Sequence, residues 1–490
     1  MNENIEEVKI KSKKSLKWST FGEVIGRLIT PLTTAILSRI LAPEIFGIVT
    51  TITIVISFCE IFSEGGFAKY IIQSDFADEN EKNKSLNVAF WSNFCLSIIL
   101  FALICIFNRQ VAGFVGSSGY ELALVVACVQ VPIYSINGAL AAVFRREFKF
   151  KKLFYIRIIT ALINLCVSVP LALLGFSYWS IIIGNISSMV ISTIVLFVMS
   201  DWHPSFYFNS KIFKNMFSFS SLNLLEALII WLCSWASSLI ISNKMDAYYL
   251  GIYKNATSMV NSLFGIITSS IIPVLFSSLS RLKNNEEEFN RMYYKMQSLT
   301  AFILLPMGIG LFIYRDLATL ILFGSKWTEA SIVIGMYCLT KIFTIVISNF
   351  ASEVYRSKGK PIVSIIAQVV YIGFLIPLCF YTVDKGFEIY VMVSSLVSLS
   401  LIITSFIFLK FFFKMQILSI FMNVLKPLIA CVPMAIIAYA LKYLFDFSQW
   451  FDVLSIIICV FVYFIMYYIF FRKDLKEKIG FMFGNKENGN

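Results

Sequence analysis

The feature that most constrains the fold is a series of long apolar segments, which follow one another from residue 17 to residue 471 with only short polar gaps. Each is about 20 residues long, the length at which an α-helix crosses the roughly 30 Å hydrocarbon layer of a bilayer. Only 14% of the residues are charged, whereas about a quarter are charged in a typical soluble domain. The sequence therefore predicts an all-α polytopic membrane protein with about 14 transmembrane helices.

The distribution of Lys and Arg predicts the orientation of the chain. Basic residues concentrate in the cytoplasmic loops of membrane proteins. If the N-terminal segment lies inside, 29 of the 41 basic residues fall in inner segments and only seven in outer loops. This alternation predicts an even number of spans with both termini cytoplasmic. It also explains the net charge of +12 by topology, so we expect no nucleic-acid partner.

A weak internal repeat suggests two halves. The segment "SRILAPEIFGIV" at 38–49 is similar to "SNKMDAYYLGIY" at 242–253, which places Gly47 and Gly251 in equivalent positions. Six spans per half predict two parallel six-helix lobes, an arrangement known from transporters. The predicted parts are an N-terminal lobe at 1–200, a C-terminal lobe at 211–410, two additional helices at 421–471 and a cytoplasmic tail at 472–490.

Five basic residues lie inside the predicted spans. A charge at the bilayer centre costs about 2.5–3.5 kcal/mol on insertion scales, so it normally faces a partner or a water-filled cavity. Arg157 and Lys426 lie close enough to the inner surface to reach it with a long side chain, and we interpret them as anchors. Arg27, Lys254 and Lys341 are deeper, and we expect them to face a cavity.

Polar residues accompany the deep cations at helical spacing. Thr34 shares a face with Arg27, Ser57 lies on a hydroxyl-rich stripe of the next span, and Ser258 and Asn261 share a face with Lys254. Hydroxyl residues alone are also typical of close helix packing. With cations on the same stripes, we favour a water-filled cavity.

The sequence carries no GxxxxGK[ST] phosphate loop, no metal-ligand cluster, no DxD pair and no nucleophile–histidine constellation. We therefore expect neither an enzyme nor a bound cofactor or metal.

Several motifs together resemble those of the Wzx-type polysaccharide-repeat flippases of the multidrug/oligosaccharidyl-lipid/polysaccharide exporter superfamily. The resemblance covers about the first 360 residues. It is carried by "LSRILAPEIFGIV" at 37–49, "FSEGGFAKYIIQ" at 62–73, "FRREFKFKKL" at 144–153, "GFSYWSIIIG" at 175–184, "YYLGIYKNATSMV" at 248–260 and "FGSKWTEA" at 323–330.

The resemblance implies two six-helix lobes around a central cavity and a substrate of the undecaprenyl-pyrophosphate-linked oligosaccharide class. Such a substrate is flipped across the bacterial inner membrane for O-antigen, capsule or exopolysaccharide synthesis, and a polysaccharide polymerase would use the product. Fixed cations can replace part of the hydration of a pyrophosphate. We expect Lys254 and Arg27 to act in this way, with Lys341 on a flanking helix and Arg39 at the outer mouth.

Three glutamates, Glu23, Glu60 and Glu226, lie in or near the predicted cavity. They can couple transport to H⁺ or Na⁺, since burial raises the pKa of a carboxyl group, or they can neutralise a cation such as Arg27 through i, i+4 pairing.

Three alternative functions remain. A cation-coupled multidrug exporter of the same superfamily would favour an acidic cavity, and the predicted one is basic. A lipid II flippase would share the pyrophosphate chemistry. A membrane polysaccharide polymerase or ligase would need a large outer loop, and all the predicted outer loops are short.

Overall fold

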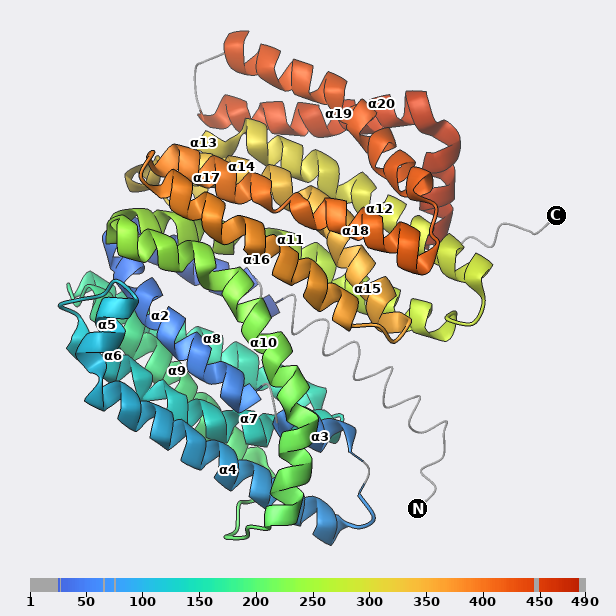
Figure 1. Ribbon diagram of the computed structural model, residues 1–490. Helices are drawn as coiled ribbons and strands as arrows, with labels where there is room; N and C mark the ends of the chain where they lie inside the picture. Colours follow the sequence, from blue (N-terminus) through green and yellow to red (C-terminus); the bar gives the residue numbers. More distant parts are fainter. Residues whose placement is uncertain (1–24, 27, 65–66, 75, 445–448, 484–490) are drawn as a thin grey trace. The chain divides into compact units, whose positions relative to one another are not determined.

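A computed structural model describes residues 25–26, 28–64, 67–74, 76–444 and 449–483. This part of the chain is helical and contains no β-strand. The helices are α2 (Pro43–Glu64), α3 (Phe67–Gln73), α4 (Glu79–Ile106), α5 (Asn108–Phe114), α6 (Glu121–Cys128), α7 (Gln130–Arg146), α8 (Phe150–Leu173), α9 (Tyr178–Met199), α10 (Ser210–Lys244), α11 (Ala247–Arg281), α12 (Glu286–Ile313), α13 (Arg315–Leu322), η1 (Ser325–Trp327), α14 (Ala330–Phe343), η2 (Thr344–Asn349), α15 (Phe350–Ser357), α16 (Ile362–Val383), α17 (Phe387–Val397), α18 (Ser400–Phe413), α19 (Ile417–Leu444) and α20 (Gln449–Phe483). Figure 1 shows them coloured along the chain.

Thirteen helical segments in the described residues are long and apolar enough to cross a membrane, and a further apolar helix covers Leu28–Ile40. Helices satisfy their backbone hydrogen bonds internally, as hydrocarbon requires. The prediction of a multi-pass, all-α membrane protein is therefore confirmed. The first predicted span is described only in part, because residues 1–24 and 27 lie outside the described ranges.

The chain forms two compact units, Met1–Ser269 and Ser270–Asn490. The first unit therefore contains α2–α10 together with the first two-thirds of α11. The division into six-helix lobes with two additional C-terminal helices remains a prediction.

In the first unit, α8 and α9 form an antiparallel pair whose backbones approach closely. A Cβ atom on Gly184 of α9 would lie 1.8 Å from the Oγ of Ser168 on α8, so only glycine fits. This approach allows polar side chains of the two helices to bond directly: Asn164 Nδ2 donates to Asn185 Oδ1 at 2.7 Å.

The N-terminal ends of α2 and α11 meet through two glycines in a reciprocal contact. A Cβ atom on Gly47 would lie 1.8 Å from the carbonyl oxygen of Ala247, and one on Gly251 would lie 1.9 Å from the carbonyl oxygen of Pro43. Each contact therefore repeats the other with the roles of the two segments exchanged. This reciprocity supports the internal repeat and fixes the start of α11 against α2.

In the second unit, α19 and α20 form an antiparallel pair that packs against α12 (Figure 1). Tyr463 Oη of α20 donates to the carbonyl oxygen of Phe302 on α12 at 2.8 Å. The φ and ψ angles of Phe471, −134° and 42°, interrupt α20. Beyond this kink, Asp474 accepts hydrogen bonds from Lys426 of α19 and from Lys478.

Candidate functional site: a polar cavity in the first unit

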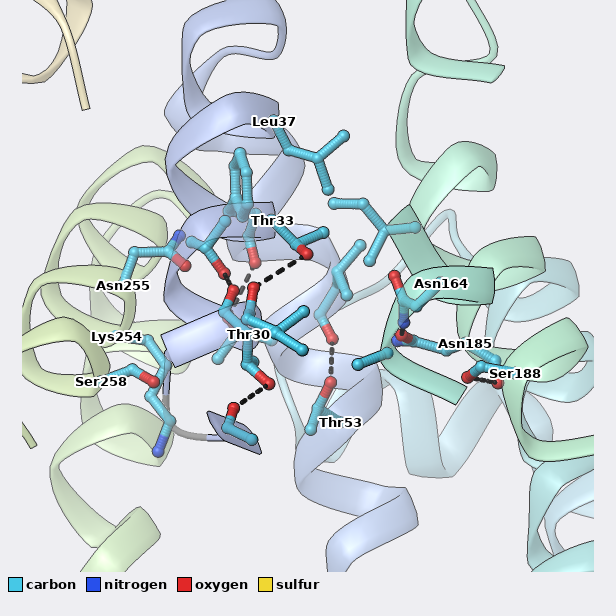
Figure 2. Close-up of a pocket in the computed structure, with 18 of the residues that line it drawn as sticks. Thr30, Thr33, Leu37, Thr53, Asn164, Asn185, Ser188, Lys254, Asn255 and Ser258 are labelled. Atoms are coloured by element: carbon cyan, nitrogen blue, oxygen red, sulfur yellow. Dashed lines mark hydrogen bonds between the residues drawn. The ribbon is translucent and has the colours of Figure 1, made fainter. Parts of the chain in front are cut away.

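A cavity of about 640 Å³ lies within the first unit, walled by helix 28–40, α2, α8, α9, α10 and α11. Figure 2 shows Lys254, Asn255 and Ser258 approaching from α11 on one side, and Asn164, Asn185 and Ser188 from α8 and α9 on the other. Thr30, Thr33 and Thr53 lie between the two groups. The volume is that of a small-molecule site.

Lys254 is the cation that α11 contributes to the cavity. It lies seven residues after the start of α11, about 10 Å along the helix axis. Its Nζ is 3.3 Å from the centroid of the Trp235 ring, a cation–π contact that partly replaces hydration. No carboxylate of the described residues lies within 4.0 Å of this Nζ, so the cavity side of the ammonium is open to an anion.

Arg157 of α8 is a second cation in the lining, with an exposed side chain. Its side chain passes over the backbone of Gly26, where a Cβ atom would lie 2.8 Å from the Arg157 Cδ. The sequence did not predict this location for Arg157, and its interpretation as an anchor at the membrane surface stays a prediction. Among the described residues, the lining contains two cations and no carboxylate.

Hydroxyl groups form the wall between the cations. The threonines of the described lining each donate the hydroxyl proton to a backbone carbonyl of their own helix, as Thr30 does to Gly26 at 3.2 Å and Thr53 to Val49 at 2.7 Å. Because a hydroxyl has one proton, its oxygen remains available to the cavity only as an acceptor.

A carboxamide pair forms the wall opposite α11. Asn164 donates to Asn185 and accepts from Ser168 Oγ at 3.0 Å, so these two hydrogen bonds hold the Asn185 side chain in place. No described residue accepts a hydrogen bond from Asn185 Nδ2, and both of its N–H groups are available to the cavity.

The structure brings together Lys254, Thr34 and Ser258 of the predicted site residues in this cavity. Arg27 and Glu23 lie outside the described residues. The other predicted residues do not line it, and their roles stay predictions: Arg39, Ser57, Glu60, Glu226, Asn261 and Lys341.

Three of these residues have distinct surroundings. Ser57 Oγ accepts a hydrogen bond from Trp231 Nε1 at 3.0 Å, which ties α2 to α10. Lys341 belongs to the second unit, where its Nζ is 5.6 Å from the Tyr337 ring centroid. Arg39 is exposed near the end of helix 28–40.

Sequence reasoning missed the contribution of α8 and α9. Arg157, Thr160 and Asn164 lie three and four residues apart, which places them on one helical face, and Asn185 and Ser188 are similarly spaced on α9. The spacing could have indicated a polar face. The described residues contain no group of His, Cys, Asp or Glu that could hold a metal ion.

The comparisons with known proteins agree with this architecture. An uncharacterised membrane protein in the cps region of Klebsiella pneumoniae is 22% identical over 96% of this chain and 98% of its own length. A putative O-antigen transporter of Shigella flexneri is 25% identical over 76% of this chain and 91% of its own length.

A solved structure of the lipid II flippase MurJ in an inward closed conformation superposes with a TM-score of 0.77 at 16% identity, over 93% of this chain and 98% of that one. The chain therefore has the fold of that structure. Residues 36–332, more than half of the chain, match the family described as "Polysaccharide biosynthesis protein". This match covers α2–α11 and, apart from residues 26–34, the lining of the polar cavity, and the chain accordingly belongs to the polysaccharide biosynthesis protein family.

Proposed function

We propose that the protein is a flippase for undecaprenyl-pyrophosphate-linked oligosaccharides. It moves these repeat units from the cytoplasmic to the outer face of the bacterial inner membrane by alternating access, for the synthesis of O-antigen, capsule or exopolysaccharide. The observation that carries this proposal is the cavity of the first unit, whose described lining holds two cations, many hydroxyl and amide groups and no carboxylate.

A pyrophosphate loses much of its hydration when it crosses a membrane, and this loss is the main barrier to flipping. Lys254 and Arg157 supply charge-assisted hydrogen bonds to its oxygens in place of water. Trp235 holds the Lys254 ammonium by its ring face, which is a weaker partner than a carboxylate, so an incoming phosphate can compete for the ammonium.

The charge pattern of the loops supports a topology with both termini in the cytoplasm and the substrate-loading side inside. Because the sequence has no phosphate loop, an ion gradient or the membrane potential drives the cycle. Glu23, Glu60 and Glu226 are the groups through which H⁺ or Na⁺ would act, or they neutralise cavity cations. A polysaccharide polymerase is the partner that would take the flipped repeat unit.

The described lining argues against a cation-coupled multidrug exporter, because a cationic drug would be repelled by Lys254 and Arg157. It is also unlike the site of a polymerase or ligase, because the described lining contains no carboxylate that could act as a general base. A lipid II flippase would bind the same pyrophosphate, and it would differ in the glycan that its substrate carries.

The test is reconstitution of the full chain into sealed vesicles with fluorescently labelled undecaprenyl-pyrophosphate oligosaccharide. The accessibility of the label is followed from each face, with and without a pH gradient or potential. We expect protein-dependent flipping, lost in Lys254→Ala. The matched control is Lys385→Ala, since Lys385 also contacts an aromatic ring, Tyr381 at 3.7 Å, but is exposed in the second unit.

Flipping of lipid II in preference to oligosaccharide repeats would assign the protein to cell-wall synthesis instead. Failure to flip any pyrophosphate-linked lipid, with folded protein in the vesicles, would reject the proposal.

A further inference from the structure

We infer that the threonine and asparagine walls of the cavity form a sugar-binding subsite, in which Asn185 is the specificity-determining residue. This inference rests on the proposed function, because it assigns the glycan of the same substrate to one part of the same cavity.

The threonine wall selects for hydrogen-bond donors. All six threonines of the described lining have their hydroxyl proton engaged by a carbonyl of their own helix, and they are Thr30, Thr33, Thr34, Thr50, Thr53 and Thr160. They present lone pairs to the cavity. A phosphate oxygen carries only lone pairs and negative charge, so it gains nothing from this wall.

Sugar hydroxyls and acetamido N–H groups can donate to the threonine oxygens. The described lining thus presents two kinds of group, cations matched to an anion at Lys254 and Arg157 and acceptors matched to a polyol. The prenyl chain is excluded from the polar wall, because an apolar chain there would leave the hydroxyl and amide groups of the wall without partners.

Asn185 supplies hydrogen-bond donors with a fixed direction, which the threonines do not provide. Its Oδ1 accepts from Asn164 Nδ2 at 2.7 Å, and Asn164 in turn accepts from Ser168. These bonds orient the Asn185 amide, and its two N–H groups can bond to sugar oxygens that the threonines cannot serve. Asn164 is the positioning residue of this pair.

The test compares binding of two kinds of lipid to the full chain purified in detergent. One probe is undecaprenyl pyrophosphate without sugar. The others carry one glucose, one galactose or one N-acetylglucosamine on the pyrophosphate. We expect at least one glycosylated probe to bind the wild type more tightly than the bare lipid.

Asn185→Leu should weaken binding of that glycosylated probe about tenfold, the effect of losing one or two hydrogen bonds, and leave binding of the bare lipid unchanged. Thr53→Val, which keeps the side-chain shape and removes an acceptor, should weaken only the glycosylated probe, by a smaller factor. Lys254→Ala should weaken both kinds of probe.

The matched control is Asn137→Leu. Asn137 belongs to the same unit and donates to Ser192 and Thr193 at 2.9 and 3.2 Å, but it does not line the cavity. An equal loss in Asn137→Leu and Asn185→Leu would attribute the effect to packing and overturn the inference.

Two further outcomes separate this inference from the proposed function. If no glycosylated probe binds more tightly than the bare lipid, or if Asn185→Leu weakens both equally, the sugar subsite is wrong while the pyrophosphate site at Lys254 stands. If the wild type binds none of the four lipids, the proposed function fails, and the sugar subsite with it.

Discussion

Two regions of the protein hold lysines in partly or fully buried sites, and they stabilise the charge in different ways. In the second unit, Lys426 and Lys478 share the carboxylate of Asp474, and the Lys478 side chain is only 7% exposed. In the first unit, Lys254 lies over the face of Trp235 and borders a cavity. A carboxylate neutralises the charge of a lysine, whereas a ring face leaves the ammonium charged and able to bind an anion.

The difference teaches that the burial of a lysine does not by itself indicate function. The Asp474 cluster joins α19 to the kinked end of α20, and Tyr467 Oη also donates to Asp474 at 2.5 Å, so the carboxylate has a full set of donors. Its role is structural. The Lys254 site has polar neighbours that line a cavity, which is the arrangement expected for a ligand that binds and leaves.

The largest predicted effect comes from giving the Lys254 site a carboxylate like the one that Asp474 provides in the second unit. Ser258 lies four residues after Lys254 on α11, so Ser258→Asp would place a carboxylate next to the ammonium. We expect vesicle flipping to fall more than tenfold, because the new ion pair occupies the cation that the pyrophosphate needs. Ser258→Asn, with the same shape and no charge, should retain most of the activity. Full flipping by Ser258→Asp would show that an open cation is not required.

The reverse change removes the shared carboxylate from the second unit. Asp474→Asn leaves Lys426 and Lys478 without their common counter-charge in a partly buried site. We expect the free energy of unfolding to fall by about 2–3 kcal/mol, somewhat less than for a fully buried pair. Thermal unfolding in detergent would measure the loss, and flipping per folded molecule should be unchanged.

A triple variant tests whether charge pairing is the cause. Replacing Lys426, Asp474 and Lys478 together with Met, Leu and Met removes all three charges and keeps apolar volume, so most of the stability should return. A triple variant as unstable as Asp474→Asn would mean that the cluster stabilises the fold by its specific hydrogen bonds.

A third prediction asks how tightly the position of Lys254 is fixed. Gly251 lies one turn before Lys254, and a Cβ atom there would overlap the carbonyl oxygen of Pro43 at 1.9 Å. Gly251→Ala should force the start of α11 away from α2 at a cost of about 1–3 kcal/mol and reduce flipping. Gly373→Ala is the control, because no atom lies within 4 Å of its new Cβ. Equal stability of the two variants would contradict the reciprocal glycine contact.

The comparison also separates what the sequence could predict from what it could not. The spans were predictable because hydrocarbon thickness sets a length that apolar runs must match, and Lys254 was predictable as a cavity residue because Ser258 repeats at helical spacing. Arg157 was not, because its distance along α8 fits a surface anchor as well as a cavity wall. The contact of the Arg157 side chain with the backbone of Gly26 accompanies its place in the cavity lining, and this tertiary feature is not visible in the sequence.

Contacts between residues far apart in the chain were the other limit. Lys426 and Asp474 are 48 residues apart, and nothing in either segment indicates that the kink at Phe471 brings them together. The Asn164–Asn185 bond likewise depends on the close approach at Gly184, a tertiary feature. The repeat marked Gly47 and Gly251 as equivalent positions, but it did not predict that the segments carrying them lie in contact.

The smallest predicted effect concerns a lysine that is paired with carboxylates outside the membrane spans. Lys149 lies between α7 and α8 and bonds to Asp201 and Glu147. The hydrogen bond from Lys149 holds the pKa of the Asp201 carboxyl below its usual value, and the bonds to Asp201 and Glu147 raise the pKa of Lys149. A lowered carboxyl pKa stabilises the fold above the unfolded pKa of about 3.9, and this contribution is lost as the pH falls through the folded value.

The melting temperature of Asp201→Asn should therefore lie slightly below that of the wild type at pH 7, and the difference should disappear in acid and shrink in high salt. Asp384→Asn, at an exposed aspartate that forms no ion pair with a described residue, is the matched control and should melt at the wild-type temperature at pH 7. If the Asp201 variant keeps its deficit at low pH, the effect comes from packing, and the water-exposed pair is not a weaker counterpart of the Asp474 cluster.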